Sequence, residues 1–391
     1  MLNISLSPWP SFTQEEADAV SKVLLSNKVN YWTGTECREF EKEFAAFAGT
    51  QYAVALSNGT LALDVALKAM GIGAGDDVIV TSRTFLASAS CIVTAGANPV
   101  FADVDLNSQN ISAETIKAAL TPNTKAVIVV HLAGMPAEMD GIMDLAKEHD
   151  LWVIEDCAQA HGAKYKGKSV GSIGHVGAWS FCQDKIMTTG GEGGMVTTND
   201  KELWSKMWSY KDHGKSYDAV YHREHAPGFR WLHESFGTNW RMMEMQAVIG
   251  RIQLKRMPEW TARRQAHAAK LAESLGKFAS IRLIEITDYI EHAQYKFYAF
   301  VKPEHLKDGW TRDRIVNELN ARKVPCYQGS CSEVYLEKAF DNTPWRPKER
   351  LKNAVELGDT SLMFLVHPTL TDDEIAFCKE HIEAVLAEAT A

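Results

Sequence analysis

The sequence predicts an α/β protein in which a large domain, with a mostly parallel sheet flanked by helices, precedes a smaller α+β C-terminal domain. Short β-rich segments alternate with helical segments over the first half of the 391 residues. Several of the β segments are continuously apolar, as strands buried on both faces are. The length also favours two domains, because one hydrophobic core seldom grows beyond about 250–300 residues.

The alternation predicts right-handed crossovers between parallel strands. The predicted strands are residues 78–81, 99–104, 126–130, 152–156, 177–181 and 194–198, and the predicted helices between them are 60–70, 86–95, 113–120 and 137–149. A long helical segment from 241 to about 275 carries an apolar stripe and connects the two domains. A strand at 295–302 and helices at 311–322 and 372–389 follow it. We expect a large domain at 1–250 and a small domain at 251–391.

Composition and charge limit the classes of function. The formal net charge of −9 argues against a nucleic-acid partner that is bound through its phosphates. No apolar run is long enough for a transmembrane helix, so we expect no membrane partner. The N-terminus lacks the basic and apolar regions of a signal peptide. The seven cysteines are scattered without a CxxC pair, which argues against a disulfide framework and against a metal site, and we expect a cytoplasmic protein.

Asp156 ends the apolar segment LWVIED, at the strand end where open α/β sheets bind their ligands. A buried carboxylate is costly unless a positive group meets it. Such a ligand group is one explanation, and a helix N-cap or a buried ion pair is the other. Gln159, three residues on, is expected to face the same side.

Lys185 follows a predicted strand and precedes a glycine-rich loop, GGEGG. A lysine whose pKa is lowered in a pocket attacks carbonyl groups, whereas a solvated lysine beside a turn does not. The glycines have neither the spacing of a P-loop nor that of a dinucleotide-binding loop. By itself this stretch leaves both interpretations of Lys185 open.

Two further segments add an anion site and an aromatic side chain. Ser57-Asn58-Gly59-Thr60 opens a helix, and a helix N-terminus either binds an anion or is simply capped. Phe85 follows a strand end, where it either stacks on a flat ring or joins the core. Together with Asp156, Ser180 and Lys185, these groups suit a phosphorylated pyridine aldehyde, whose ring nitrogen pairs with a carboxylate and whose aldehyde is held by an amine.

The chain resembles the sugar aminotransferases of the DegT/StrS type, which are pyridoxal 5'-phosphate (PLP) enzymes of the aspartate-aminotransferase-like fold type I. The resemblance covers nearly the whole chain, from Leu6 to Ile375. Its motifs are SNGTLAL (57–63), HLAG (131–134), VIEDCAQAHGAKYKGK (153–168), SFCQDK (180–185), GGEGGMVTTND (190–200) and GTNWRM (237–242).

The resemblance implies a role for each matched residue. Lys185 corresponds to the Schiff-base lysine and Asp156 to the partner of the pyridine nitrogen. Asn239 corresponds to a phosphate ligand from the neighbouring subunit, so a homodimer is expected. The other implied cofactor contacts are Gly59 and Thr60 in the phosphate loop, Ser180 at the phosphate, Phe85 on the ring and Gln159 against the cofactor.

The implied reaction moves an amino group from an amino acid, expected to be L-glutamate, to a keto-sugar nucleotide. A 4-keto-6-deoxyhexose is the expected sugar, and cell-surface polysaccharide biosynthesis, such as that of O-antigen, is the expected pathway. Candidate substrate contacts are His131, Glu192, Tyr327 and the basic segment 211–233. The family has a His-Tyr-Pro-like stretch where this chain has VPCYQG, which leaves the sugar open. The alternatives are an aminotransferase for another keto-sugar or sugar acid, and a regulator without catalysis.

Overall fold

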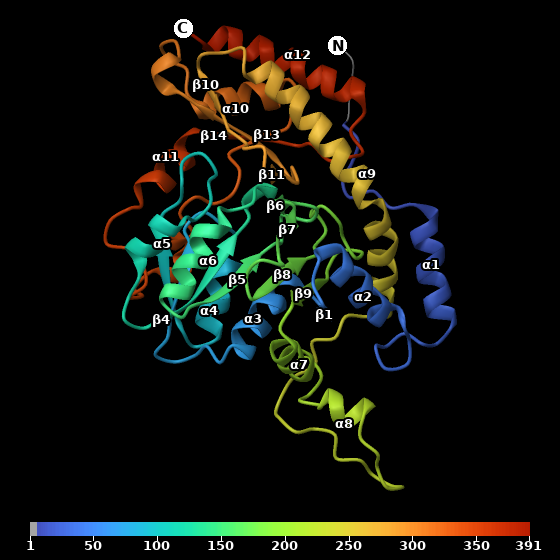
Figure 1. Ribbon diagram of the computed structural model, residues 1–391. Helices are drawn as coiled ribbons and strands as arrows, with labels where there is room; N and C mark the ends of the chain where they lie inside the picture. Colours follow the sequence, from blue (N-terminus) through green and yellow to red (C-terminus); the bar gives the residue numbers. More distant parts are fainter. Residues whose placement is uncertain (1–5) are drawn as a thin grey trace.

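The computed structural model describes residues 6–391 and shows a large domain joined to a small one by a long helix (Figure 1). The first five residues, on which the expected absence of a signal peptide partly rests, lie outside the described residues. Seven strands form the central sheet, in the order β1-β9-β8-β5-β4-β2-β3. They are β1 (Tyr52–Leu56), β2 (Asp77–Thr81), β3 (Asn98–Ala102), β4 (Thr124–Val130), β5 (Trp152–Asp156), β8 (Val176–Ser180) and β9 (Gly194–Thr198).

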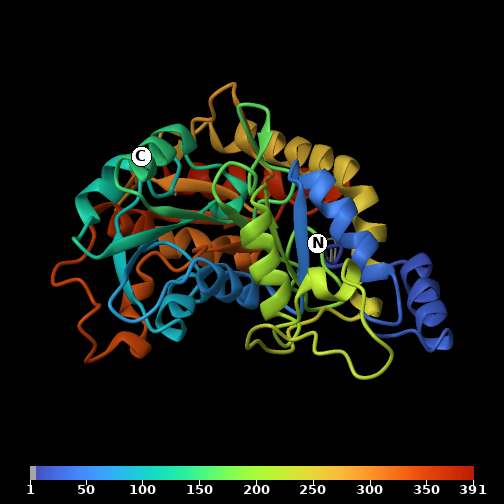
Figure 2. The ribbon, with the colours of Figure 1, turned by 60° about the horizontal axis from the view of Figure 1, so that its bottom comes forward.

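The sheet is mostly parallel, which confirms the predicted fold class. Only β9 runs against its neighbours, β8 and β1. Two predicted strands, 152–156 and 194–198, have the observed bounds, and the other four differ by one or two residues at their ends. Strand β1 has no predicted counterpart. It is a short apolar segment at the sheet edge (Figure 2), and such a segment fits a strand or a buried helix equally well.

Helices cover both faces of this sheet. Alternate strand residues face opposite sides, so Val78 and Val80 pack in one core cluster, whereas Ile79 packs in another. The first cluster includes residues of α3, α4 and α7, and the second includes residues of α5 and α6. The helices are α1 (Gln14–Leu25), α2 (Glu36–Ala48), α3 (Gly59–Ala69), α4 (Ala87–Thr94), α5 (Ala113–Ala119), α6 (Met139–Glu148), α7 (Lys201–Tyr210) and α8 (Tyr217–Tyr221).

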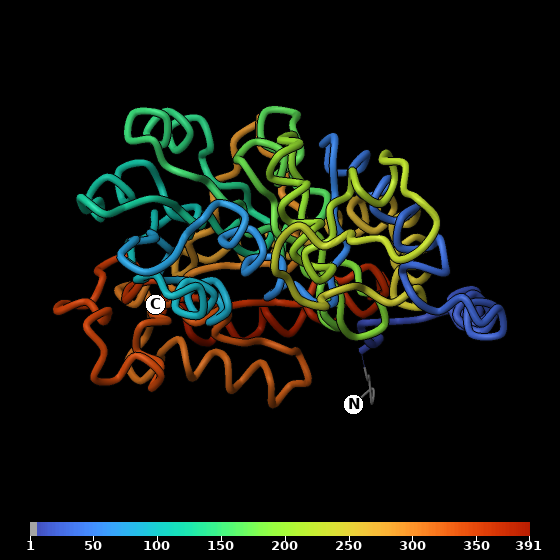
Figure 3. The backbone as a smooth tube through the Cα atoms, turned by 90° about the horizontal axis from the view of Figure 1, so that it is seen from below, coloured from blue at the N-terminus to red at the C-terminus, as the bar shows by residue number. Residues whose placement is uncertain are grey.

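The small domain is an antiparallel four-stranded sheet covered by helices. Its strand order is β10-β12-β14-β13. The strands are β10 (Ile281–Leu283), β12 (Phe297–Val301), β13 (Cys326–Tyr327) and β14 (Ser361–Phe364), and the helices are α10 (Arg312–Ala321), α11 (Lys352–Thr360) and α12 (Asp372–Ala389). Seen from below, most of its orange and red segments gather on one side of the large domain (Figure 3).

Helix α9 (Glu244–Leu275) is the predicted connector and begins three residues after its expected start. It packs on α1 and α2 with one end and on α12 with the other. The expected domain division at 250 and 251 therefore falls inside this helix and stays a prediction. A small sheet of β6 (Lys164–Tyr165), β7 (Lys168–Ser169) and β11 (Ile290–Glu291) also joins the two domains.

The segment around α8 leaves the body of the large domain and forms the projection at the bottom of Figure 1. It exposes several large apolar side chains, Phe229, Trp231 and Phe236 among them. Over residues 6–391, none of the helices combines the length and apolar character that crossing a membrane requires.

Candidate active site

A cavity of about 600 Å³ lies at the carboxyl ends of β4, β5 and β8. Parallel strands bring their carboxyl ends to one edge of the sheet, and for that reason distant segments of the chain meet here. The cavity gathers eight of the predicted site residues: Gly59, Thr60, Phe85, Asp156, Gln159, Ser180, Lys185 and Glu192.

Asp156 lies on the cavity wall, almost completely buried. Its carboxylate accepts hydrogen bonds from the Ser88 hydroxyl at 2.8 Å and from the Ala158 amide at 3.1 Å. Burial raises the pKa of Asp156 above its ordinary value, while the bonds from Ser88 and Ala158 and the charge of Lys185 act against that rise. A cationic ring nitrogen would supply the missing positive partner. The sequence interpretation missed Ser88, whose only local signal is a hydroxyl three residues after Phe85.

Backbone amides and glycines form another part of the cavity, at the start of α3. Asn58 caps α3 by accepting from the Leu61 amide at 3.0 Å, so the amides of Gly59 and Thr60 have no acceptor within the helix. A Cβ atom on Gly59 would lie 2.5 Å from the Ser180 Cβ, and one on Gly194 would lie 2.2 Å from the Asn58 carbonyl oxygen. Glycine therefore permits this close approach, and the donors that result suit a phosphate group.

Two flat side chains line the cavity between these ends. Phe85 keeps 72% of its surface exposed, although large apolar side chains are usually buried. A planar ring in the cavity would cover it. Gln159 is held by the Ala133 amide, which donates to its Oε1 at 2.8 Å. Ala133 itself has a φ of 56°, so a strained turn after β4 supports this contact.

Lys185 reaches the cavity from the loop after β8 and contacts a network that the sequence interpretation missed. Its Nζ lies 3.3 Å from Asp184 Oδ1. The Tyr295 hydroxyl donates to the other oxygen of Asp184, and the Trp9 indole donates to the Lys185 carbonyl at 2.8 Å. Although burial acts against it, the charge of Lys185 and the Tyr295 hydroxyl hold the pKa of Asp184 below its ordinary value. The lysine amine therefore lies beside an ionised carboxylate that is itself fixed.

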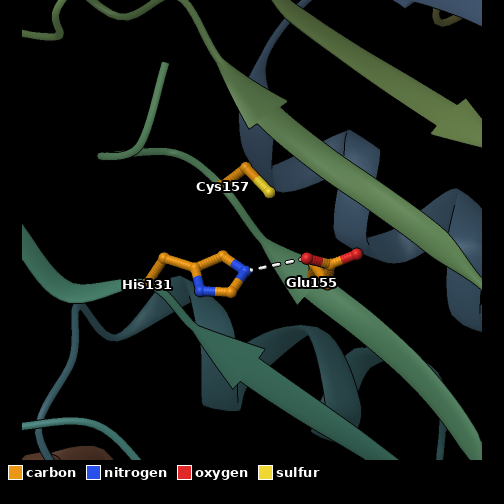
Figure 4. A group of neighbouring side chains, drawn as sticks. All are labelled: His131, Glu155 and Cys157. Carbon is orange, nitrogen blue, oxygen red and sulfur yellow. Dashed lines mark hydrogen bonds and ion pairs between the residues drawn. The ribbon is translucent and has the colours of Figure 1, made fainter. Parts of the chain in front are cut away.

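His131 does not line the cavity, which contradicts the prediction that it contacts the sugar. Its ring is fully buried, with Nε2 at 2.9 Å from Glu155 Oε2 and Nδ1 accepting from the Ala137 amide at 3.1 Å (Figure 4). Strand alternation explains the placement, because Asp156 faces the cavity and Glu155, one residue earlier, faces the other way. His131 follows β4 on the side of Glu155.

His131, Glu155 and Cys157 bring three potential metal-ligand atoms within 4.8 Å of one another (Figure 4). Both imidazole nitrogens already have partners, and the Glu155 carboxylate also accepts from the amides of Gly171, Ile173 and Gly174. Burial raises the pKa of the Cys157 thiol well above its ordinary value. These contacts explain why the three side chains lie together, because they stabilise the ends of β4 and β5.

The remaining candidates lie apart from this cavity. Tyr327, on β13, lines a second cavity that shares Asp184 with the first. Asn239 is exposed, forms a β-bridge with Asp212 and is not among the residues that line the cavity of its own chain. Within the basic segment 211–233, Lys211 is completely buried, and Arg223 pairs with carboxylates of the same projection.

The geometry agrees with comparisons to known proteins. The model of the DegT/DnrJ/EryC1/StrS aminotransferase family matches residues 10–383. A GDP-perosamine synthase of Escherichia coli O157:H7 is 42% identical over 377 residues, which cover 95% of this chain and 96% of that protein. A UDP-N-acetyl-3-dehydro-alpha-D-glucosamine 3-aminotransferase of Acidithiobacillus ferrooxidans is 42% identical over 363 residues, or 91% and 90% of the two chains. An aminotransferase of known structure from Psychrobacter cryohalolentis is 65% identical, with a TM-score of 0.96 over 98% of this chain and 99% of its own.

Proposed function

The chain belongs to the DegT/DnrJ/EryC1/StrS aminotransferase family and is a PLP-dependent sugar aminotransferase, and we propose that it transfers the amino group of L-glutamate to a nucleotide-linked 4-keto-6-deoxyhexose. The observation that carries the proposal is the cavity itself. It places a buried carboxylate, an amine and a glycine-framed helix start around one space.

The residues present suit each part of the cofactor. Bound PLP supplies a pyridine ring that accepts electron density from the reacting carbon. Asp156 would hold the proton of the ring nitrogen. The amides of Gly59 and Thr60, with the Ser180 hydroxyl, would bind the phosphate. Phe85 and Gln159 line the same cavity, and each would contact the ring.

Lys185 is the residue that we assign to covalent attachment and proton transfer. Its Nζ would hold the aldehyde carbon of the cofactor and, once displaced by an amino substrate, would move a proton at the carbon that carries the amino group. The contacts with Asp184 and Trp9 restrict where the amine goes. A lysine with fixed neighbours pays less conformational entropy when it reacts.

The active form that we propose is a homodimer in which Asn239 completes the phosphate site of the neighbouring subunit. Two placements support this: Asn239 is exposed outside its own cavity, and the projection that precedes it extends away from the body of the chain. The exposed Phe229 and Trp231 on this projection would be covered in such an assembly.

The names of the two relatives support a nucleotide-linked keto-sugar as acceptor, since both denote enzymes of nucleotide sugars. One name contains GDP and the other UDP, so the two relatives do not indicate a single nucleotide base for the substrate of this chain. The C4 position and the 6-deoxy group rest on the family resemblance alone, as does a role in cell-surface polysaccharide such as O-antigen. All seven cysteines are free, which supports a reducing cytoplasm as the compartment.

Two half-reactions test the proposal separately. Glutamate should bleach the visible absorption of the holoenzyme, and a 4-keto-6-deoxy sugar nucleotide should restore it with formation of the amino sugar, identified by mass spectrometry. The Lys185→Ala variant is the matched control and should do neither. If pyruvate and other 2-oxo acids restore the absorption while no keto-sugar nucleotide does, the proposed substrate class is wrong.

A further inference from the structure

A second cavity, of about 660 Å³, adjoins the active site at the junction of the two domains. The N-terminal segment around Trp9 forms one wall, and residues of the small domain, Lys296, Lys323 and Tyr327 among them, form the other. Asp184 lines both cavities. A substrate held in the second cavity would therefore extend toward Lys185.

Lys296 is half-buried in this cavity, immediately before β12. Its Nζ lies 4.8 Å from the centroid of the Tyr295 ring, and the Nζ of Lys185 lies 5.6 Å from the same centroid. Within the described part of the chain, the Lys296 ammonium has no hydrogen-bond or ion-pair partner. Burial lowers the pKa of Lys296 to about 8.

A second unpaired cation lies behind the first. Arg264, on α9, is completely buried, and its only polar contact among residues 6–391 is a hydrogen bond of 3.3 Å to the Tyr295 carbonyl. Its Nε and Nη2 have no partner in that part of the chain. The guanidinium carbon lies 5.0 Å from the centroid of the Trp9 ring, at the wall of the cavity. Burial lowers the pKa of Arg264 to about 9.

The charges around the second cavity are thus unbalanced. Asp184 is the one carboxylate among its described lining residues, and it already contacts Lys185 and Tyr295. Keeping an unpaired charge away from water costs free energy, and proteins usually avoid that cost. An anionic group of a substrate would remove the imbalance, whereas neutral sugar hydroxyls would not.

We propose that this second cavity is an anion subsite of the active site, in which Lys296, with Arg264 behind it, binds a carboxylate or phosphate group of a substrate. This inference rests on the proposed function and extends it. The carboxylate would come from the amino donor, glutamate, and the phosphate from the sugar nucleotide. Both carry oxygen anions that an ammonium group binds strongly.

Kinetics of the two half-reactions distinguish these sources. Lys296→Met should raise the concentration of the bound substrate that gives half-maximal rate in its half-reaction. The expected rise is about ten- to a hundredfold, the usual effect of losing a charged hydrogen bond. A rise for glutamate alone identifies the donor carboxylate, and a rise for the sugar nucleotide alone identifies the phosphates. Lys296→Arg should retain most of the affinity. Lys302→Met, which removes a lysine at the other end of β12, is the matched control and should change neither half-reaction.

Chemical modification gives a readout that does not depend on turnover. Acetic anhydride should modify Lys296 in the holoenzyme, and glutarate or uridine diphosphate should protect it, as measured by mass spectrometry of the peptide. Modification of Lys302 should be the same with and without these probes. If neither probe protects Lys296, the subsite is refuted even where Lys296→Met alters the kinetics. If a probe protects Lys296 while no keto-sugar nucleotide reacts, the subsite stands and the proposed acceptor fails.

Discussion

Replacing Glu155 by glutamine tests the buried pair that supports the catalytic strand end. Oε1 of Glu155 accepts from the amides of Ile173 and Gly174 at 2.8 and 2.6 Å. Oε2 accepts from the Gly171 amide at 2.8 Å and faces His131 Nε2 at 2.9 Å. The nitrogen of a glutamine amide is only a donor. In either orientation it would therefore oppose two donors at a fully buried position.

The size of the effect follows from those contacts. Each lost hydrogen bond to a charged acceptor is worth about 1.5–3 kcal/mol, so the two lost bonds amount to about 3–6 kcal/mol. Native domains are stable by only about 5–15 kcal/mol, so Glu155→Gln should unfold at a much lower temperature than the wild type. Glu291→Gln is the matched control, because Glu291 pairs with Lys164 at an exposed site, where an ion pair contributes about 1 kcal/mol or less.

The difference should also depend on pH. Burial by itself would raise the pKa of Glu155, but the contacts with His131 and with the amides of Gly171 and Gly174 outweigh it and hold the pKa below 4.5. A carboxyl group with a lowered pKa stabilises the fold above its ordinary pKa and loses that contribution as the pH falls through the folded value. The melting temperature of the wild type should therefore exceed that of Glu155→Gln most clearly above pH 4.5. The difference between the two should shrink in more acidic buffer.

Thermal denaturation followed by circular dichroism at several pH values measures this difference, and release of PLP on dialysis shows whether Asp156 has moved. Equal melting temperatures for the wild type and Glu155→Gln at neutral pH would refute the argument. So would a difference that grows as the pH falls.

Three further changes address the cofactor site. Asp156→Asn removes the carboxylate, so transamination should slow by at least about tenfold while borohydride still fixes PLP to Lys185; an unchanged rate would make Asp156 structural. Gly59→Ala would place a Cβ 2.5 Å from the Ser180 Cβ, so equilibrium dialysis should show PLP bound about 10- to 100-fold more weakly, and an unchanged affinity would contradict the phosphate assignment. Asn239→Ala and Lys185→Ala should each be inactive, but dimers reassembled from a mixture should recover activity, since one site of each hybrid has both native residues; no recovery would exclude a shared site.

Local patterns in the sequence predicted much of the large domain. The apolar strand that ends in Asp156 and the strand after the glycine loop have the bounds that the sequence indicates. Both segments are bounded by turn residues, and β-branched side chains within them favour a strand. Strand β1 has the same length, but Ala53 and Ala55 are residues that favour a helix, and its strand conformation depends on pairing with β9, far along the chain.

The sequence by itself determined the fold class and indicated eight of the residues that line the cavity, because the ends of parallel strands converge wherever strands alternate with helices. Only the tertiary structure decided the partners of those residues. It placed His131 behind the sheet, Tyr327 in the second cavity, and Trp9 and Tyr295 beside Lys185. It also brought Arg264 and Lys296 close to the second cavity, where neither has an ion-pair partner among residues 6–391. Such contacts join segments that are distant in the chain, and their identity depends on which faces pack together, which no local pattern specifies.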